Sequence, residues 1–284
     1  MANLKEIRSR IASINSTMQI TSAMKMVSAA KSKKAQDAIM AMKPYANKLN
    51  ELLNSLGSAL GESNPFMPRT ESPENILVLA ITSDRGLCGA FNSNIIKQAL
   101  AISERFEGKN VTFRTIGKKG NDILRKTGKV VCFDEHIFDS LSFAKITPIA
   151  EELMNAYQSG TYDKIILLYN SFKNVATQVV TEEIFLPIQP VSENNEASLD
   201  YIYEPSKQTI VDALIPKSLK MQLYKALRDS FAAEHGARMT AMHKATDNAT
   251  ELRNQLKLTY NKARQTTITN EILEIVAGAE ALGK

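Results

Sequence analysis

Tryptophan is absent from this 284-residue chain, and aromatic residues make up only 6% of it. Large aromatic side chains usually fill thick hydrophobic cores, so their scarcity indicates that much of the chain is thin rather than globular. Apolar residues still account for 44% of the total, which excludes gross disorder. The sequence therefore predicts a folded protein that combines a modest core with extended parts.

Cysteine and histidine are scarce as well. Cys88 and Cys132 are isolated and lack metal-ligand spacing, so neither a disulfide framework nor a zinc site is expected. The histidines His136, His235 and His243 are too scattered to hold one ion, and we expect them to be solvated or packed. The sequence thus predicts no metal and no cofactor.

Long apolar runs are missing too. No stretch approaches the ~18 residues that a membrane-spanning helix needs, and no signal peptide opens the chain. These absences predict a soluble, intracellular protein of bacterial origin.

Positive charge gathers at the two ends of the chain. Residues 1–60 carry nine Lys or Arg against three acids, a net +6, and residues 211–284 carry eleven against eight, a net +3. The middle, 61–210, carries fifteen against nineteen, a net −4. Basic ends suit an acidic partner. Nucleic acid is disfavoured, because the basic residues lie among Ala, Met and Thr without aromatic residues or a known binding motif.

Both ends repeat apolar or small residues at steps of three and four, which is typical of a coiled-coil seam. The N-terminal repeat runs through Leu4, Ile7, Ile11, Ile14, Met18 and Thr21, drifts to Val27 and Ala30, and recovers at Met42, Tyr45, Leu49, Leu52 and Leu56. The C-terminal helix is expected from about Pro216, and its repeat runs through Met242, Ala245, Ala249, Leu252, Leu256, Thr259, Ala263, Thr266, Asn270, Leu273 and Ala277. A single small domain cannot cover helices this long, so we predict that residues 1–60 and 210–284 form one antiparallel coiled coil.

Residues 74–207 alternate between strand and helix patterns. We predict strands at 76–82, 111–116, 130–133 and 164–169, helices at 92–106, 121–126 and 149–157, and an antiparallel edge strand at 175–185. The continuous apolar run Ile76–Thr82 suits a buried parallel strand. The predicted fold class is therefore α/β plus a long antiparallel coiled coil, with a central Rossmann-like domain whose sheet is mainly parallel.

The turn Ser83–Asn92 follows the first predicted strand, where α/β folds often bind nucleotide phosphates. It lacks the Gly-Lys-Ser/Thr of a P-loop and the third glycine of a dinucleotide fingerprint, so a packed tight turn is favoured. The alternative function is a nucleotide-dependent α/β enzyme with helical dimerisation arms. The carboxylate pairs 151–152 and 182–183 point apart and are expected at the surface. No catalytic residue is identified.

The C-terminal segment 268–282 is apolar on nearly all sides of the predicted helix. Its apolar residues are Ile268, Ile272, Leu273, Ile275, Val276, Ala277, Ala279, Ala281 and Leu282. An antiparallel partner covers only one face, so we expect a further partner to enclose this end. Fraying in solvent and a membrane-surface anchor are the alternatives. Its charges, Glu271, Glu274 and Glu280, disfavour the anchor.

Several segments resemble the gamma subunit of F-type ATP synthases, in its bacterial form. They are Leu4–Ile11, Ile20–Val27, Pro44–Tyr45, Asp84–Asn92 and Lys262–Ile272. The resemblance covers the whole chain, and the two helix motifs are specific together. It implies a non-catalytic central-stalk rotor that transmits torque between the membrane ring and the catalytic hexamer of a proton-translocating ATP synthase.

The resemblance also implies partners: a threefold ring of alternating alpha and beta subunits around the coiled coil, and the epsilon subunit and membrane c-ring at the α/β domain. Through this complex, the chain would lie peripherally on the cytoplasmic side of the cell inner membrane.

Site residues follow from the same resemblance. Arg264, Gln265 and Thr269 match positions that contact the beta subunits, and Met24 matches a position that passes their acidic loops. Ser22 departs from relatives that carry Lys there. An apolar bearing is implied for the tip residues Ile272, Leu273, Ile275, Val276 and Leu282.

Overall fold

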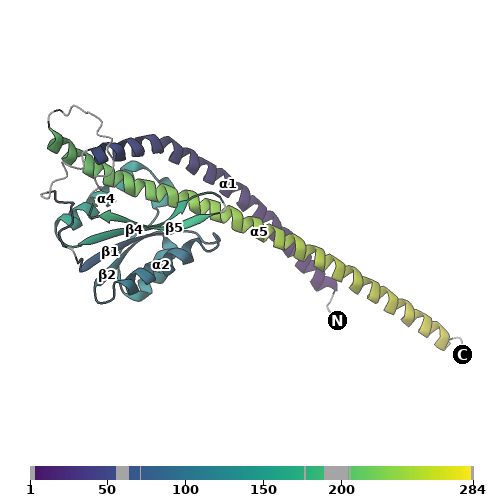
Figure 1. Ribbon diagram of the computed structural model, residues 1–284. Coiled ribbons are helices and arrows are strands. Elements are labelled where there is room, and N and C mark those ends of the chain that lie inside the picture. The colour runs from purple at the N-terminus through teal and green to yellow at the C-terminus, as the bar shows by residue number, and fades with distance from the viewer. Residues whose placement is uncertain are drawn as a thin grey trace. The chain divides into compact units, whose positions relative to one another are not determined.

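The computed structural model describes residues 4–55, 64–70, 72–175, 177–188, 204 and 206–282, apart from the side chains of 50, 53–55 and 280–282. The chain divides into two compact units. One contains residues 1–27 and 239–284, and the other contains residues 28–238. Two long helices, α1 (Leu4–Ser55) and α5 (Lys207–Leu282), contribute to both units (Figure 1). The predicted seam position Leu56 and most of the predicted loop 190–207 lie outside the described residues.

The unit of residues 28–238 is built on a five-stranded sheet of order β3-β2-β1-β4-β5. Its strands are β1 (Asn75–Ile81), β2 (Asn110–Ile116), β3 (Val130–Asp134), β4 (Lys164–Phe172) and β5 (Gln178–Leu186). The first four run parallel, and β5 pairs antiparallel with β4. The predicted mainly parallel sheet with an antiparallel edge strand is confirmed.

Helices cover both faces of this sheet. Its shorter helices are α2 (Phe91–Arg105), α3 (Lys118–Leu124) and α4 (Phe143–Gln158). Figure 1 shows α2 on one face and α4 with α5 on the other. Alternate residues of β1 point to opposite faces, so Val78 packs against α2 while Leu79 packs against α4 and α5. Six residues bring α5 into the second core: Val211, Ile215, Leu219, Leu223, Ala226 and Leu227.

Two helices that contain a proline begin well before the predicted residue, because burial overrides the proline signal. The sequence placed the start of α4 after Pro148, but α4 begins at Phe143 and buries Ile146. In the same way α5 begins at Lys207 rather than near Pro216. In both helices the proline lies inside, and the turns before it contribute core residues.

In the other unit, α1 pairs with α5 as far as Ala263. Four side-chain contacts join them: Arg8 to Tyr260 at 2.7 Å, Met18 to Thr250 at 3.3 Å, Thr21 to Thr246 at 2.8 Å and Lys25 to His243 at 3.3 Å. Residue numbers rise along α1 as they fall along α5. The predicted antiparallel pairing of the two ends is confirmed.

The predicted seam is right at the N-terminal end of α1 and partly wrong elsewhere. Leu4 to Thr21 are buried or half-buried at every predicted position. On α5, Leu252 and Thr259 are exposed, whereas their neighbours Arg253 and Tyr260 face inward. Long side chains can cover a seam with their apolar stems and keep the polar ends accessible, so hydrophobicity alone chose the wrong neighbour.

Farther along α1 the seam is made of small residues rather than apolar ones. Val27, Ala30 and Tyr45 are exposed, contrary to the prediction, while Ser28, Ser32 and Ala35 are buried in the 28–238 unit. Met42, Leu49 and Leu52 are buried or half-buried, as predicted. On α5 the predicted seam positions Thr266, Asn270, Leu273 and Ala277 are exposed, so the paired part of the helix ends at Ala263.

Candidate functional site

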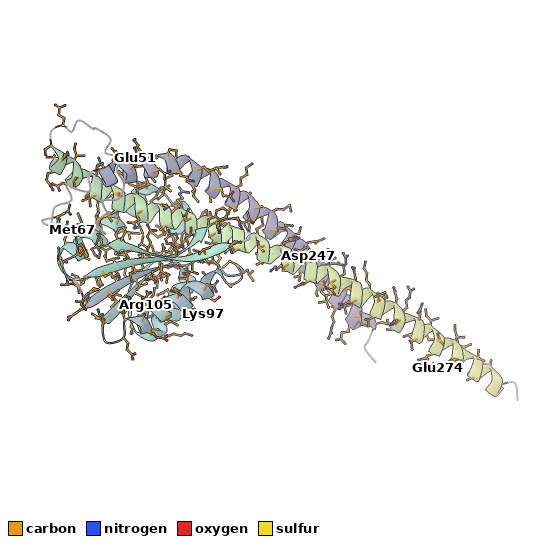
Figure 2. All side chains as sticks on the ribbon, in the orientation of Figure 1. Glu51, Met67, Lys97, Arg105, Asp247 and Glu274 are labelled. Atoms are coloured by element: carbon orange, nitrogen blue, oxygen red, sulfur yellow. The ribbon has the colours of Figure 1, made fainter. Side chains whose placement is uncertain are left out.

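The C-terminal part of α5 is exposed on all its sides. Every described side chain from Arg264 to Ala279 is exposed. The segment nevertheless carries Ile268, Ile272, Leu273, Ile275 and Val276, of which Ile275 is 71% accessible. Figure 2 shows the side chains around Glu274 standing out on several sides of the helix. An apolar cluster of this kind at one helix end is typical of an interaction surface.

The predicted contact residues of α5 lie at the start of this exposed segment. Arg264, Gln265 and Thr269 are all exposed. Gln265 and Thr269 are four residues apart and share a face, whereas Arg264 points about 100° away from Gln265 around the helix. The predicted tip residues Ile272, Leu273, Ile275 and Val276 follow within the same exposed segment, and the side chain of Leu282 lies outside the described residues.

Met24 belongs to a separate exposed surface. It is 39% accessible on α1, and it shares a helix face with the exposed Ile20 and Val27. The contact from Lys25 to His243 places Met24 about twenty residues along α5 from Arg264, which is ~30 Å. The structure therefore does not bring Met24 together with the other predicted contact residues.

Threonine hydroxyls on the exposed segment are bonded within the helix. Thr266 donates to the carbonyl oxygen of Lys262 at 3.1 Å, and Thr267 donates to that of Ala263 at 2.9 Å. Thr269 donates to the carbonyl oxygen of Gln265 at 3.0 Å. These hydroxyls find acceptors one helical turn earlier without any partner chain.

The turn Ser83–Asn92 lies in the 28–238 unit and is held by its own side chains. The backbone N–H of Ser83 donates to Asn92 Oδ1 at 2.9 Å, and Asn92 Nδ2 donates to Ser83 Oγ at 2.8 Å. Leu87 and Gly89 adopt positive φ angles of 63° and 62°. Such a conformation is uncommon for leucine, so the surroundings must hold the turn in place.

Arg238 of α5 anchors this turn. Its Nη2 donates to the carbonyl oxygens of Arg85 at 3.1 Å and Gly86 at 3.3 Å. Its Nη1 lies 2.7 Å from Glu234 Oε1 and 3.3 Å from His235 Nδ1. The sequence analysis missed this cluster. The available signal was three ionisable residues, at 234, 235 and 238, within a stretch of alanine and glycine.

Burial sets the charge states of the cluster. Burial raises the pKa of Glu234 above its usual range, while the nearby Arg238 opposes that shift. Burial, with the nearby positive charges of Arg238 and Lys31 adding to its effect, lowers the pKa of His235 to about 4. At neutral pH His235 is therefore uncharged, so that Nδ1 can accept a hydrogen bond from Arg238.

The same turn was the candidate phosphate site, and its packing distinguishes a phosphate-binding turn from a packed one. Cys88 and Phe91 pack against Ala233 and Ala237 of α5, and Cys88 is buried. Burial raises the pKa of the Cys88 thiol, with the hydrogen bond between Cys88 and Ser83 opposing it, so this thiol is a poor nucleophile at neutral pH. The packed-turn prediction is confirmed, and the geometry disfavours the nucleotide-dependent enzyme.

The adjacent carboxylates take separate partners. The partners are Lys220 for Glu151, Arg114 for Glu152, Arg105 for Glu182, and Tyr169 with Gln222 for Glu183. Contrary to the prediction, Glu183 is half-buried, because β5 pairs with β4 and the Glu183 carboxylate accepts a hydrogen bond from Tyr169. Within the described ranges, no three His, Cys, Asp or Glu residues are arranged to hold a metal ion.

Comparison with known proteins identifies the family to which this architecture belongs. A family model described as ATP synthase matches residues 3–282. The ATP synthase gamma chain of Flavobacterium johnsoniae is 64% identical, with 99% of each chain covered. The chain belongs to the ATP synthase gamma-chain family. The gamma chain of Flavobacterium psychrophilum is 61% identical over the same share of both chains.

Solved structures share this fold. The central stalk and c-ring structure of the Tetrahymena thermophila mitochondrial ATP synthase contains a chain with 26% identity and a TM-score of 0.61, covering 80% of this chain and 99% of that one. A chain of the Euglena gracilis mitochondrial ATP synthase has 20% identity and a TM-score of 0.71, covering 98% and 94%. No helix among the residues with assigned positions has both the length and the apolar character to cross a bilayer.

Proposed function

We propose that this gamma-family chain is the central-stalk rotor of a proton-translocating F-type ATP synthase. It transmits torque between the membrane ring and the catalytic alpha–beta hexamer and performs no bond chemistry itself. The identity to bacterial gamma chains supports this role, as does the likeness to a chain from a central stalk and c-ring structure.

The observation that carries the proposal is the exposed end of α5. Every described side chain from Arg264 to Ala279 is exposed, although the segment holds five large apolar residues. Enclosure of such a surface by a partner is favourable, because it removes apolar area from water. We infer an apolar bearing, formed by the hexamer, around the tip residues Ile272, Leu273, Ile275, Val276 and Leu282.

Two antiparallel helices suit the role of a rotor for a symmetry reason. A helix pair has no threefold axis, so each of three surrounding catalytic sites meets a different face of it. Rotation presents those faces in turn. The differing contact free energies then bias each site between open and closed states.

Contacts with the beta subunits are assigned to two separate surfaces. The upper surface is the one nearer the C-terminal end of α5, and it consists of Arg264, Gln265 and Thr269. The Arg264 guanidinium there suits a carboxylate of the partner. Met24, with Ile20 and Val27 beside it, forms the second, about 30 Å lower along the shaft. Because the two are so far apart, they serve different parts of the hexamer.

The remaining parts of the assembly follow from this role. Residues 1–60 and 210–284 act as one coiled-coil shaft, and residues 74–207 act as the α/β domain that meets the epsilon subunit and the c-ring. The chain lies peripherally on the cytoplasmic side of the cell inner membrane and reaches the membrane through its partners.

The upper contacts can be tested by substitution in the assembled complex. Arg264→Ala and Gln265→Ala should each lower ATP turnover by about tenfold, since a hydrogen bond to a charged partner contributes ~1.5 to 3 kcal/mol. The isolated variants should unfold at the same urea concentration as the parent chain, because both residues are exposed. Steady-state ATP hydrolysis is the measurement.

Two exposed residues lower on α5 provide matched controls. Lys257→Ala and Gln255→Ala remove a cation and an amide of the same kinds and should leave turnover unchanged. If turnover is normal in both upper variants, the contact assignment is wrong. If the parent chain does not co-elute with a threefold alpha–beta assembly, the rotor role itself is wrong.

A further inference from the structure

In the 28–238 unit, α5 is buried most completely just before it leaves that unit. All seven residues from Ala232 to Arg238 are buried, whereas the helix is partly exposed before and after them. Leu227 is the last α5 residue in the larger core. The attachment of residues 232–238 therefore depends on other contacts, and Arg238 is the last residue of the unit.

Three segments surround this part of α5, and we call the arrangement the collar: residues 28–35 of α1, the turn 83–92 and residues 172–175. Ser28, Ser32 and Ala35 of α1 are buried, and Lys31 lies close enough to affect the titration of His235. Space is tight on another side. A Cβ added at Gly236 would lie 3.3 Å from the carbonyl oxygen of Val175.

Apolar contact in the collar is slight. The apolar cluster between the turn and α5 consists of Cys88, Phe91, Ala233 and Ala237, with Phe172 beside it. Alanine methyl groups are too small to interlock with their neighbours, so they hardly resist rotation of a helix about its own axis. Contacts of this type resist separation of the two elements better than they resist sliding.

Arg238 supplies the directional contacts that the alanines lack. One nitrogen of its guanidinium bridges the carbonyl oxygens of Arg85 and Gly86, and another contacts Glu234 and His235. A planar guanidinium with several bonded N–H groups fixes orientation as well as distance. The turn that it holds contains Leu87 at a positive φ, a conformation that depends on external restraint.

We propose that Arg238 is a positioning residue whose guanidinium locks the turn 83–92 to α5, so that the α/β domain and the shaft helix rotate as one body under torque. The mechanical part of this inference rests on the proposed rotor function. The structural part, the locking of the turn, can be judged on the isolated chain.

Arg238→Lys is the first test, because lysine keeps a positive charge beside Glu234 but cannot bridge two carbonyl groups with a planar fork. In the full chain, hydrogen–deuterium exchange of the turn 83–92 should become about tenfold faster than in the parent, since a charge-assisted contact is lost. Arg228→Lys is the matched control. Arg228 is also an α5 arginine that donates to a backbone carbonyl, that of Leu141 at 2.8 Å, and its replacement should leave the turn unchanged.

A second variant avoids an unpaired buried charge. Glu234→Gln combined with Arg238→Gln removes both charges and the fork together, and it should loosen the turn to a similar degree. In the assembled complex, both the lysine variant and this double variant should pump fewer protons per ATP hydrolysed. Hydrolysis itself should continue, because the catalytic sites are on other chains.

The outcomes distinguish the locking role of Arg238, its torque role and the rotor proposal from one another. Unchanged exchange of the turn in both variants would overturn the locking role of Arg238. Faster exchange with normal proton pumping per ATP would overturn the torque role and leave only a structural lock. If the parent chain fails to couple hydrolysis to pumping in the complex, the rotor proposal fails, and the exchange experiment still decides whether Arg238 locks the turn.

Discussion

Single residues in the 28–238 unit show two ways of burying charge. Arg114 of β2 is almost inaccessible and is fully paired: it contacts Asp134 at 2.7 and 3.0 Å and Glu152 at 2.9 Å. Asp229 of α5 is half-buried near another acid, Glu183, with Lys225 as the nearby cation. The first arrangement satisfies its charges, whereas the second leaves a carboxylate that is destabilised by its surroundings.

Asp229 yields a prediction about pH. Burial raises the pKa of Asp229 from its ordinary value of 3.8 to about 6, with Glu183 adding to the shift and Lys225 opposing it. A carboxyl group with a raised pKa in the folded state favours folding when protonated, and that contribution disappears as the pH rises from about 4 through 6. Asp229→Asn should therefore raise the free energy of unfolding at pH 8 by about 1 kcal/mol, after allowance for partial exposure.

Urea unfolding at pH 4, 6 and 8 measures this effect. The difference between Asp229→Asn and the parent should shrink as the pH falls and vanish near pH 4. Asp212→Asn, at an exposed position on the same helix, is the control and should show no such trend. A gain that is constant across this range would contradict the electrostatic explanation.

At the scale of elements, the helix pair of residues 4–27 and 239–263 depends on a narrow seam. Ile7 is buried in it, whereas Leu258 on α5 faces away and is 65% exposed. Ile7→Ala should cost ~2 kcal/mol of stability, at the low end for a buried isoleucine because two helices enclose it incompletely. Leu258→Ala should change stability by less than ~0.5 kcal/mol. Exchange rates of the amides in residues 4–20 of the isolated chain report the difference. Equal rates in the two variants would mean that the seam lies elsewhere.

Elements differed in how well the sequence predicted them. The strand Ile76–Thr82 was found to within one residue, because a continuous apolar run has few interpretations. The seam around Leu252 and Thr259 was not, since a three-four repeat can shift by one position when Ala, Thr, Arg and Tyr share the contact. Small buried residues such as Ser28 and Ser32 give no hydrophobic signal at all.

The sites followed the same division. The exposed apolar end of α5 was predictable, because it is local and its composition is unusual for a free helix end. The Arg238 cluster was not, because it joins residues about 150 positions apart through backbone carbonyl groups, which every residue possesses. Only the folded chain shows which carbonyls face the guanidinium.

At the scale of the whole molecule, stability and the proposed function reside in different parts of the chain. The described side chains of residues 264–279 are all exposed, and the paired seam ends at Ala263. A chain truncated after Ala263 should therefore unfold at the same urea concentration as the full chain. The free energies of unfolding of the two chains should agree within ~0.5 kcal/mol. Its helical circular dichroism should fall only by the share of the missing turns.

Truncation after Thr246 is the control for that prediction, because it removes the seam residues Ala249, Thr250, Arg253, Leu256, Tyr260 and Ala263. The amides of residues 4–20 should then exchange almost as fast as in an isolated helix, which is marginal in water. If truncation after Ala263 also made these amides exchange faster, the exposed end of α5 would have a role in folding that its accessibility does not indicate.

The hydroxyl groups of Thr266, Thr267 and Thr269 have a consequence for motion. Each already donates its proton to a carbonyl oxygen of its own helix, so the side chain presents mainly a methyl group outward. A neighbour that moves past this surface leaves none of those three donors unsatisfied. These three positions therefore need no donor from a partner, at a surface that must also remain soluble before assembly.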